Sequence, residues 1–143
     1  MKSFSLLRVI PLISVVCVLL AVLCCCDSTQ KAEYYSQKEN YISVTGVVTG
    51  IRQNEEADAF YIDFSDLSPV LDDTCFKIVG ENAEIVKANK IDEKIKIGEQ
   101  ITFITAPKYF GDGYVMPIVA ISTKDETLLG FEEGYKNLLD WLS

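Results

Sequence analysis

The chain has 143 residues, of which 13 are basic and 21 are acidic, and it contains no histidine. Its length allows one domain with a single modest core. The absence of histidine excludes Ser–His and Cys–His nucleophilic pairs and zinc sites that need an imidazole ligand, so we expect a non-enzymatic protein without cofactor or metal.

Residues 1–26 have the three-part pattern of a secretory signal. Lys2 and Arg8 begin it, an apolar run follows, and the polar segment Asp27–Gln30 comes directly after the run. The run also approaches the ~20 apolar residues that a spanning helix needs. An uncleaved transmembrane anchor is therefore one alternative to a cleaved and lipidated protein, and a cleaved soluble form is another.

Three cysteines end the apolar run, and Cys26 is the best candidate for lipidation. Leu23 stands three residues before it and the small Cys25 stands directly before it, a pattern that resembles the lipobox of bacterial lipoproteins. The resemblance implies cleavage before Cys26 and a diacylglycerol on its thiol. We therefore expect an extracytoplasmic protein that is anchored in the cell membrane.

The exported part is strongly acidic. Lys2 and Arg8 are the only charged residues among residues 1–26, so the remainder carries 11 basic and 21 acidic side chains and a net charge of −10. Such a charge repels the phosphate backbone and disfavours nucleic acid as a partner. The candidate partners that remain are the membrane, an envelope protein and a small ligand. Basic residues concentrate only at Lys87, Lys90, Lys94 and Lys96, where Asp92 and Glu93 interrupt them.

Residues 27–40 are polar and mixed in charge, and Tyr34 and Tyr35 are their only bulky pair. No apolar period favours a packed helix here. We interpret the segment as a tether that lifts the domain off the membrane surface.

Five strands and one intervening helix are predicted between residues 41 and 122. Gly46 and Gly50 in the first strand predict a bulge or a bend, Gly111–Gly113 predicts a hairpin turn, and Pro117 predicts an edge or a bulge. Cys75, in the third strand, is expected to be buried. The strands are Tyr41–Ile51, Phe60–Phe64, Thr74–Val79, Ile101–Tyr109 and Tyr114–Ser122; the helix is Gly80–Lys90, with Asn82 as a candidate N-cap, and Arg52–Asp58 is a polar loop.

This order of elements is that of an OB-fold, a five-stranded Greek-key barrel with a helix between strands three and four. The segments Val44–Thr49, Tyr61–Asp63, Thr74–Phe76 and Lys96–Thr102 resemble the small tRNA-anticodon-type OB-fold domains of bacterial exported proteins and lipoproteins. The resemblance covers residues 41–122. It implies oligonucleotide binding, although fold does not imply function, and the acidic charge and the export signal argue against that function here.

Residues 123–143 end in the clearest helix of the sequence. Phe131, Tyr135, Leu138, Leu139 and Leu142 follow one another at helical spacing and form one continuous apolar face. We expect this face to cap an open end of the barrel. The alternative is a stripe that is offered to a partner, with Trp141 as an anchor.

An OB-fold usually binds its ligand over strands two and three, between the first–second and fourth–fifth loops. The resemblance therefore implies a candidate surface that combines polar and aromatic side chains and could stack on a sugar ring or hold a peptide strand. Its residues are Arg52, Gln53, Tyr61, Asp63, Lys77, Tyr109, Phe110 and Tyr114.

We predict a mainly β protein: a signal or anchor helix, a tether, the barrel and a C-terminal amphipathic helix. Its predicted function is that of a lipid-anchored extracytoplasmic binding or accessory module of the bacterial envelope. An OB-fold protein that binds single-stranded nucleic acid or oligosaccharide is the first alternative, and an enzyme that uses carboxylates is the second. That enzyme would depend on Glu55, Glu56, Asp58, Asp63, Asp66, Asp72 and Asp73, which match no EF-hand loop.

Overall fold

The computed structural model describes residues 32–56, 58–108 and 115–143. The chain divides into two compact units, Met1–Tyr34 and Tyr35–Ser143, and only residues 32–34 of the first are described. The predicted signal, the lipidation of Cys26 and the candidate residues Tyr109, Phe110 and Tyr114 lie outside the described residues. Within the described ranges, no helix is both long enough and apolar enough to cross a membrane.

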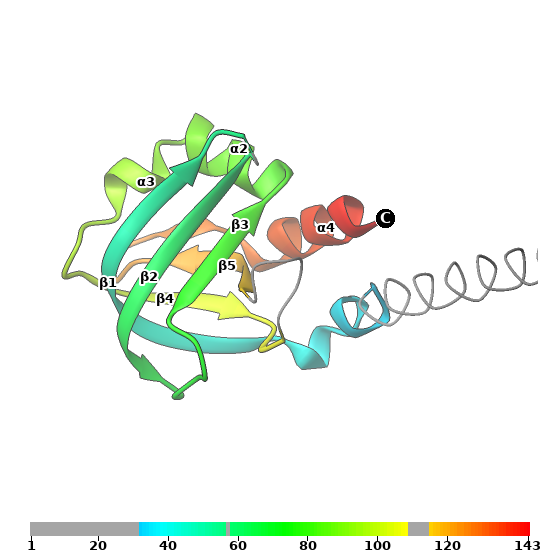
Figure 1. The fold of residues 1–143 in the computed structure, drawn as a ribbon, viewed down its shortest axis with the longest axis horizontal. Coiled ribbons are helices and arrows are strands. Elements are labelled where there is room, and N and C mark those ends of the chain that lie inside the picture. Colours follow the sequence, from blue (N-terminus) through cyan, green and yellow to red (C-terminus); the bar gives the residue numbers. More distant parts are fainter. Residues whose placement is uncertain (1–31, 57, 109–114) are drawn as a thin grey trace, which may run out of the picture. The chain divides into compact units, whose positions relative to one another are not determined.

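The second unit is built around one six-stranded sheet, in which neighbouring strands are antiparallel (Figure 1). The strand order is β3-β2-β1-β4-β5-β6. In addition, β3 pairs with β5 in parallel, with Phe76 opposite Met116 and Lys77 opposite Pro117. The strands are β1 (Ile42–Asn54), β2 (Ala59–Ser68), β3 (Cys75–Val79), β4 (Gln100–Thr105), β5 (Met116–Ser122) and β6 (Thr127–Leu129).

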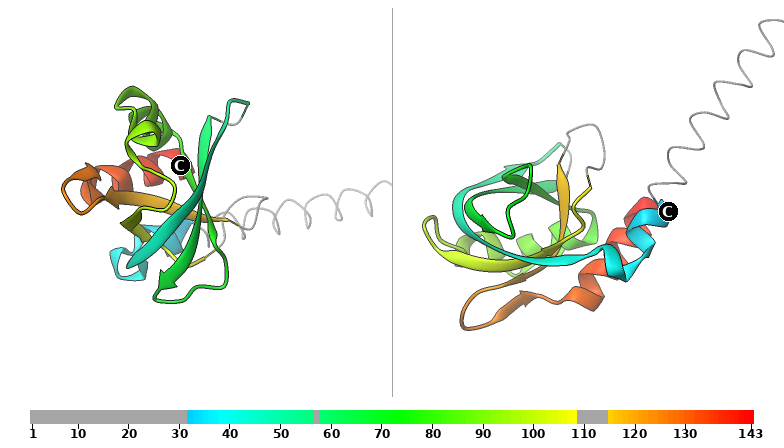
Figure 2. Two further views of the ribbon diagram at one scale, coloured as in Figure 1. Left: turned by 90° about the vertical axis from the view of Figure 1, so that its left-hand side faces the viewer. Right: turned by 90° about the horizontal axis from the view of Figure 1, so that it is seen from below.

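Strand β1 is long and bent, and its glycines allow the bend. The β1–β2 register shifts between Thr45 and Val47 and again between Val48 and Gly50, so the predicted irregularity is confirmed. A Cβ atom on Gly46 would lie 2.8 Å from Cδ2 of Leu67. The missing side chain therefore lets β2 come close where β1 curves around the sheet (Figure 2).

Three phenylalanine rings form the centre of the core. Phe103 on β4 stacks on Phe64 of β2 with 4.4 Å between the ring centroids, and it meets the edge of Phe76 on β3 at 4.8 Å. The cluster thus joins strands that are far apart in the sheet order. Aliphatic side chains from every strand and from the helices after β3 complete it: Val44, Val48, Ile62, Ile78, Ala83, Val86, Ile91, Ile95, Ile101, Met116, Ile118, Ile121 and Leu129.

Two helices fill the connection between β3 and β4: α2 (Glu81–Ala88) and the short α3 (Ile91–Lys94). The predicted helix is confirmed, but Asn82 is not its N-cap. Gly80, at a φ of 58°, holds that position, and Asn82 is 1 % exposed inside the first turn. Its side chain is turned toward the C-terminal helix, where Nδ2 donates to the carbonyl oxygen of Gly134 at 2.8 Å.

The C-terminal helix α4 (Phe131–Leu142) has the predicted bounds. It packs on β5 and α2 (Figure 1), so its apolar face covers part of the folded unit. The reason lies in β5, where all residues from Met116 to Ile121 are buried, so that both faces of the strand need a cover. Only Leu138 and Gly134 of α4 are fully buried, and the other apolar residues of its face are half-buried.

The end of the segment predicted as a tether belongs to the folded unit. Residues 32–36 are helical, and the 3-10 helix η2 (Lys38–Asn40) follows. Tyr35 is fully buried, and its hydroxyl donates to the carbonyl oxygen of Lys108 at 2.7 Å. Its own carbonyl oxygen accepts from the hydroxyl of Tyr41 at 2.9 Å.

The same segment is bound to α4. The ring of Tyr41 meets those of Phe131 and Tyr135 edge-on, at centroid distances of 5.7 and 5.4 Å. Lys38 forms an ion pair of 2.6 Å with Glu132 and lies over the rings of both α4 aromatics. We refer to these contacts of Lys38 and Tyr41 with α4 as the clasp. The clasp holds the start and the end of the folded unit together.

The predicted polar loop Arg52–Asp58 is shorter in the structure. Arg52, Gln53 and Asn54 continue β1 and pair with Tyr61, Phe60 and Ala59 of β2. Polar side chains are tolerated there because the end of the hairpin is exposed to solvent. The sequence analysis also missed β6, which is only three residues long.

Candidate functional site

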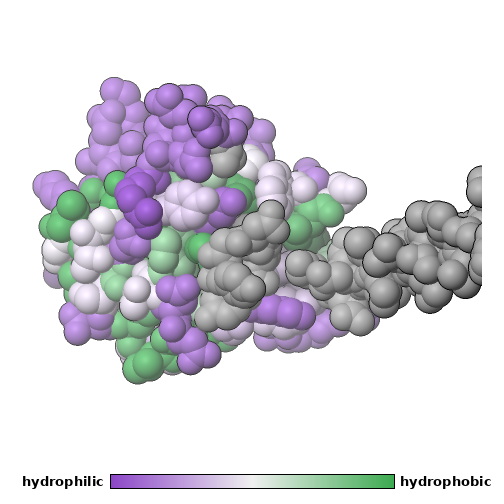
Figure 3. All heavy atoms as spheres, in the orientation of Figure 1, coloured by the Kyte–Doolittle hydropathy of each residue, from purple (hydrophilic) through white to green (hydrophobic). Residues whose placement is uncertain are grey.

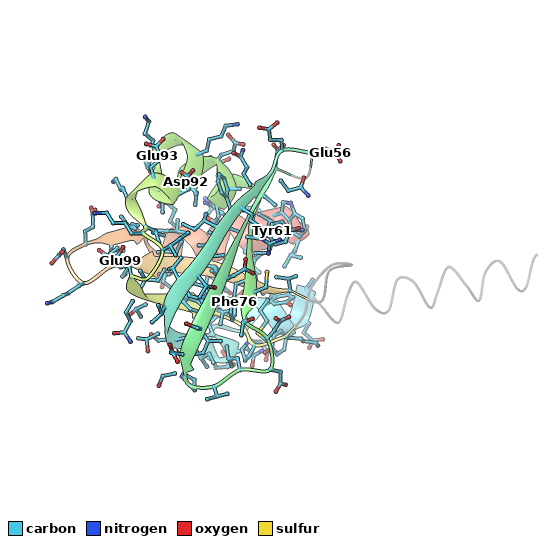
Figure 4. The ribbon with its side chains drawn as sticks, turned by 60° about the vertical axis from the view of Figure 1, so that its left-hand side comes forward. Glu56, Tyr61, Phe76, Asp92, Glu93 and Glu99 are labelled. Atoms are coloured by element: carbon cyan, nitrogen blue, oxygen red, sulfur yellow. The ribbon has the colours of Figure 1, made fainter. Side chains whose placement is uncertain are left out.

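Three predicted site residues form one row across three strands. Arg52 on β1 stands opposite Tyr61 on β2, and Tyr61 stands opposite Lys77 on β3. The guanidinium carbon of Arg52 lies 5.5 Å from the centroid of the Tyr61 ring, and the ammonium of Lys77 lies 5.6 Å from it. Both distances are within the range of cation–π attraction. Tyr61, labelled in Figure 4, is thus flanked by two cations.

The row lies on the outer face of the sheet. Neighbours of its members along the strands, Ile62 on β2 and Phe76 and Ile78 on β3, are buried in the core. Because successive side chains of a strand point to opposite faces, Tyr61 and Lys77 point away from the core. We refer to the outer side of β1, β2 and β3 around Tyr61 as the outer face.

A second row beside the first fixes the position of Arg52. Here Gly50 of β1 stands opposite Asp63 of β2, which stands opposite Cys75 of β3. Asp63 accepts two hydrogen bonds from Arg52, Nε to Oδ2 at 3.1 Å and Nη2 to Oδ1 at 3.0 Å. A bidentate pair of this kind orients a guanidinium group strongly.

Gly50 provides the room for this ion pair. A Cβ atom at residue 50 would lie 3.0 Å from Oδ2 of Asp63, the oxygen that accepts from Nε of Arg52. A larger residue would therefore displace the carboxylate. The Asp63 carboxylate also raises the pKa of Arg52, through its hydrogen bonds and its charge, so Arg52 remains cationic at every physiological pH.

Cys75 lies on the outer face and is only partly buried, which corrects the prediction of a buried thiol. Strand alternation places it there, since Phe76 beside it fills the core. Nη2 of Arg52 donates to its Sγ at 3.4 Å. Burial, and then the nearby Asp63 carboxylate, raise the pKa of Cys75 to about 11, against the opposing effect of Arg52. The group is therefore a neutral thiol at pH 7 and a poor nucleophile.

A shallow groove adjoins the outer face at the β1–β2 turn. Gln53 reaches this groove but not the row itself, because it stands opposite the inward-pointing Phe60. Glu56, at the tip of the turn, is labelled in Figure 4. The groove is lined by Arg52, Gln53, Asn54, Glu55, Glu56 and Tyr61.

The remaining charged clusters do not form comparable sites. Among the described residues, no group of three or more His, Cys, Asp or Glu side chains could hold a metal ion. Lys90 forms an ion pair of 3.7 Å with Glu93. The surface over α2 and α3 is hydrophilic throughout (Figure 3), as expected of a solvated helix pair.

The sequence therefore located four residues that the structure brings together: Arg52, Tyr61, Asp63 and Lys77. It missed Gly50 and Cys75 as their neighbours. Strand alternation was the available signal for Cys75, since it places Cys75 on the same face as Lys77. The position of Gly50 follows from the register shift in β1, which the sequence does not specify.

Comparisons of the chain with protein-family models, with curated proteins and with solved structures gave no match.

Proposed function

We propose that this protein is a lipid-anchored, extracytoplasmic binding or accessory module of the bacterial envelope, that its domain is an OB-type barrel, and that its ligand binds on the outer face without being chemically changed. The observation that carries the proposal is the row Arg52–Tyr61–Lys77, which presents two cations and a phenol on an exposed sheet surface.

The strand pairing supports the barrel. The parallel pairing of β3 with β5 links strands that stand at opposite ends of the order β3-β2-β1-β4-β5. Five strands joined in this way, with helix α2 between the third and fourth, correspond to the OB topology. The outer face would then occupy the usual OB ligand position, over strands two and three.

The path of β1 supports a role at a membrane surface. The chain enters the sheet at Ile42, and Arg52 lies ten residues further along the same strand. Ten residues of strand extend up to about 33 Å. If Cys26 carries the lipid, Arg52 therefore lies toward the opposite end of β1 from the point at which the anchored chain enters the domain, where a ligand outside the membrane can reach it.

The chemistry of the outer face supports binding rather than catalysis. Arg52 is held by Asp63, and the Cys75 thiol is neutral. The two carboxylates nearest Cys75 already have partners: Asp63 accepts from Arg52, and Asp73 accepts from the backbone N–H groups of Thr74 and Cys75. The groups that the outer face offers to a ligand are cations and an aromatic ring, which bind a ligand without changing it chemically.

Hydrogen exchange of the full-length protein in detergent micelles tests this proposal. Exchange of the backbone amides is measured with and without each of four classes of candidate ligand: neutral oligosaccharides, acidic oligosaccharides, extended peptides and oligo-dT. We expect one ligand class other than oligo-dT to protect the segments of β1, β2 and β3 that carry the row. Tyr61→Ala should abolish the protection, whereas Thr102→Ala, on the outward side of β4, should not.

Two results would contradict the proposal. Protection confined to other strands, or unaffected by Tyr61→Ala, would place the site elsewhere. Oligo-dT as the strongest ligand, with a steep dependence on salt, would favour the alternative of a nucleic-acid-binding OB-fold. Unfolding curves of both variants serve as the control for loss of structure.

A further inference from the structure

The outer face has unused hydrogen-bond donors of positive charge. Arg52 donates through Nε and Nη2 to Asp63 and Cys75, and its Nη1 has no partner among the described residues. The ammonium of Lys77 has no carboxylate within ion-pair distance in the part of the chain that the structure describes; its contact there is the Tyr61 ring. These donors lie on either side of Tyr61, one on each neighbouring strand.

The local charge differs from that of the whole domain. The exported part carries a net charge of −10, but within the two rows Arg52 and Lys77 stand against the single carboxylate of Asp63, which Arg52 already neutralises. Asp73, next to the second row, accepts from the backbone N–H groups of Thr74 and Cys75. Lys77 is therefore the cation of the rows without a carboxylate partner among the described residues, and it matches one negative group on a ligand. An extended polyanion would need several cations, and it would meet Glu55 and Glu56 in the adjoining groove.

The groove indicates what the rest of the ligand is. Its lining contains two amides, Gln53 and Asn54, and two carboxylates, Glu55 and Glu56. Carboxylates accept hydrogen bonds and repel anions, and amides both donate and accept. The Asn54 amide oxygen already accepts from the backbone N–H of Glu56 at 3.1 Å. A chain of hydroxyl groups suits the other three side chains, Gln53, Glu55 and Glu56, whereas an apolar or anionic segment does not. The open, shallow shape suits an extended chain rather than an enclosed molecule.

We propose that the outer face binds an oligosaccharide that bears a carboxylate group. The carboxylate lies at Lys77, beside the Tyr61 ring. Neutral sugar residues extend across Arg52 on the other side of the ring, where Nη1 donates to a hydroxyl group, and along the groove toward Gln53. This inference rests on the proposed function, since it names the ligand class of the same face. Asp63 does not contact the ligand: it is a positioning residue that keeps Arg52 in place.

The test is calorimetric titration of the full-length protein in detergent micelles with two probes. The first is a xylo-oligosaccharide that carries one glucuronic acid residue, and the second is its methyl ester, which has the same chain without the charge. We expect the acid to bind about tenfold or more tightly than the ester, which corresponds to about 1.4 kcal/mol. Binding of the acid should weaken with added salt.

Matched variants locate the carboxylate. Lys77→Gln should weaken binding of the acid about tenfold and leave binding of the ester unchanged. Lys124→Gln removes the same charge in a different surface depression, lined by Thr45, Thr102 and Lys124, and should change neither. Asp63→Asn should reduce affinity for the acid and the ester alike while Lys77 is intact, because it releases Arg52 from its fixed orientation beside the groove.

Several results would overturn the inference. Equal affinity for the acid and the ester would show that the ligand needs no carboxylate. The outer face would then be a neutral binding surface, and the proposed function would stand. The ligand would not be a saccharide if the acid did not bind. The same conclusion would follow if a poly-glutamate peptide bound more tightly than the acid, in a manner that depends on Lys77. The proposed function itself fails on different results: no ligand of the hydrogen-exchange panel other than oligo-dT protects β1, β2 and β3, or Tyr61→Ala leaves the protection unchanged.

Discussion

Gly134→Ala tests how closely α4 approaches the sheet. A methyl group at residue 134 would overlap the carbonyl oxygen of Val119 on β5. This oxygen belongs to the backbone of a strand that pairs with β4 on one side and β6 on the other, so it cannot yield cheaply. The helix must instead move away by about 1.5 Å to restore contact at van der Waals distance. That movement partly uncovers Leu138 and strains the hydrogen bond from Asn82 to Gly134.

The magnitude follows from these losses. Full burial of a leucine side chain contributes about 1.5–3 kcal/mol, and inserting a group into a filled space costs about 1–3 kcal/mol. Alanine offsets about 1 kcal/mol of this through its better helix propensity. We therefore expect Gly134→Ala to lower the free energy of unfolding by about 2–4 kcal/mol and the melting temperature by about 10 °C.

Trp141 provides the assay, because it is the only tryptophan of the chain and it lies in α4 against Gly80. Its fluorescence can follow unfolding of the full-length protein in detergent. Gly130→Ala is the comparison, since a Cβ atom there meets nothing within 4 Å. Residue 130 is the N-cap of α4, where glycine is preferred to alanine, so this variant should cost only about 1 kcal/mol. A neutral or stabilising Gly134→Ala would refute the close contact between α4 and β5.

Three further predictions concern burial, a thiol and the anchor. Leu138→Ala should cost about 2–5 kcal/mol, because the side chain is fully buried, whereas Lys136→Ala on the exposed side should leave the unfolding curve nearly unchanged. Cys75 should react with iodoacetamide at pH 8 roughly a hundredfold more slowly than a free cysteine, measured on its own peptide, because its pKa is raised to about 11. For the same reason the free energy of unfolding should fall as the pH rises from about 9 through 11, because the thiol ionises in the unfolded chain before it does in the folded one. Cys75→Ser should reduce this fall. An equal fall in the variant would show that other groups cause it. Metabolic labelling with a fatty acid should mark the protein, and Cys26→Ala should remove most of the label. If the label persisted in this variant, the lipidated residue and the cleavage site would have to be assigned to another cysteine.

The elements with a clear period were predictable from the sequence. Alternation of Phe60, Ile62 and Phe64 with polar residues predicted β2, and the helical spacing of Phe131, Tyr135 and Leu138 predicted α4 with its bounds. Both patterns record one apolar face and one solvated face. The burial of α4 was less predictable, because it depends on Gly134. A glycine does not contribute to a pattern of apolar side chains, but Gly134 determines how closely α4 can approach β5.

Asn82 and Tyr35 show why local patterns were insufficient elsewhere. A residue such as asparagine at a helix start is statistically a cap, but Asn82 bonds to α4, more than fifty residues away. Tyr35 stands in a polar segment without helical periodicity of apolar residues, yet it is fully buried, and it is hydrogen-bonded to Lys108 and Tyr41. Such tertiary partners leave no signal in the neighbouring sequence.

The site was predictable in part for a related reason. Tyr61, Asp63 and Lys77 follow from strand alternation, since residues that do not face the core must face solvent. Arg52 was placed in a loop, but the pairing of β1 with β2 continues past it. Its role as the partner of both Tyr61 and Asp63 depends on the register shift at Gly50, which sets which side chains stand opposite one another. Register is a property of the paired strands and not of either sequence alone.

The clasp separates the outer face from the proposed anchor. The chain that leads from Cys26 reaches the folded unit at Tyr35, and Lys38 and Tyr41 bind α4 before β1 begins. If the chain is anchored through Cys26, as we propose, a force on the anchor acts first on the contacts of η2 and Tyr41 with α4. The row Arg52–Tyr61–Lys77 lies at the other end of β1 and depends on Gly50 and Asp63 for its geometry. Because none of these contacts involves the clasp, we expect a variant that breaks the clasp, such as Lys38→Ala, to leave ligand binding at the row unchanged.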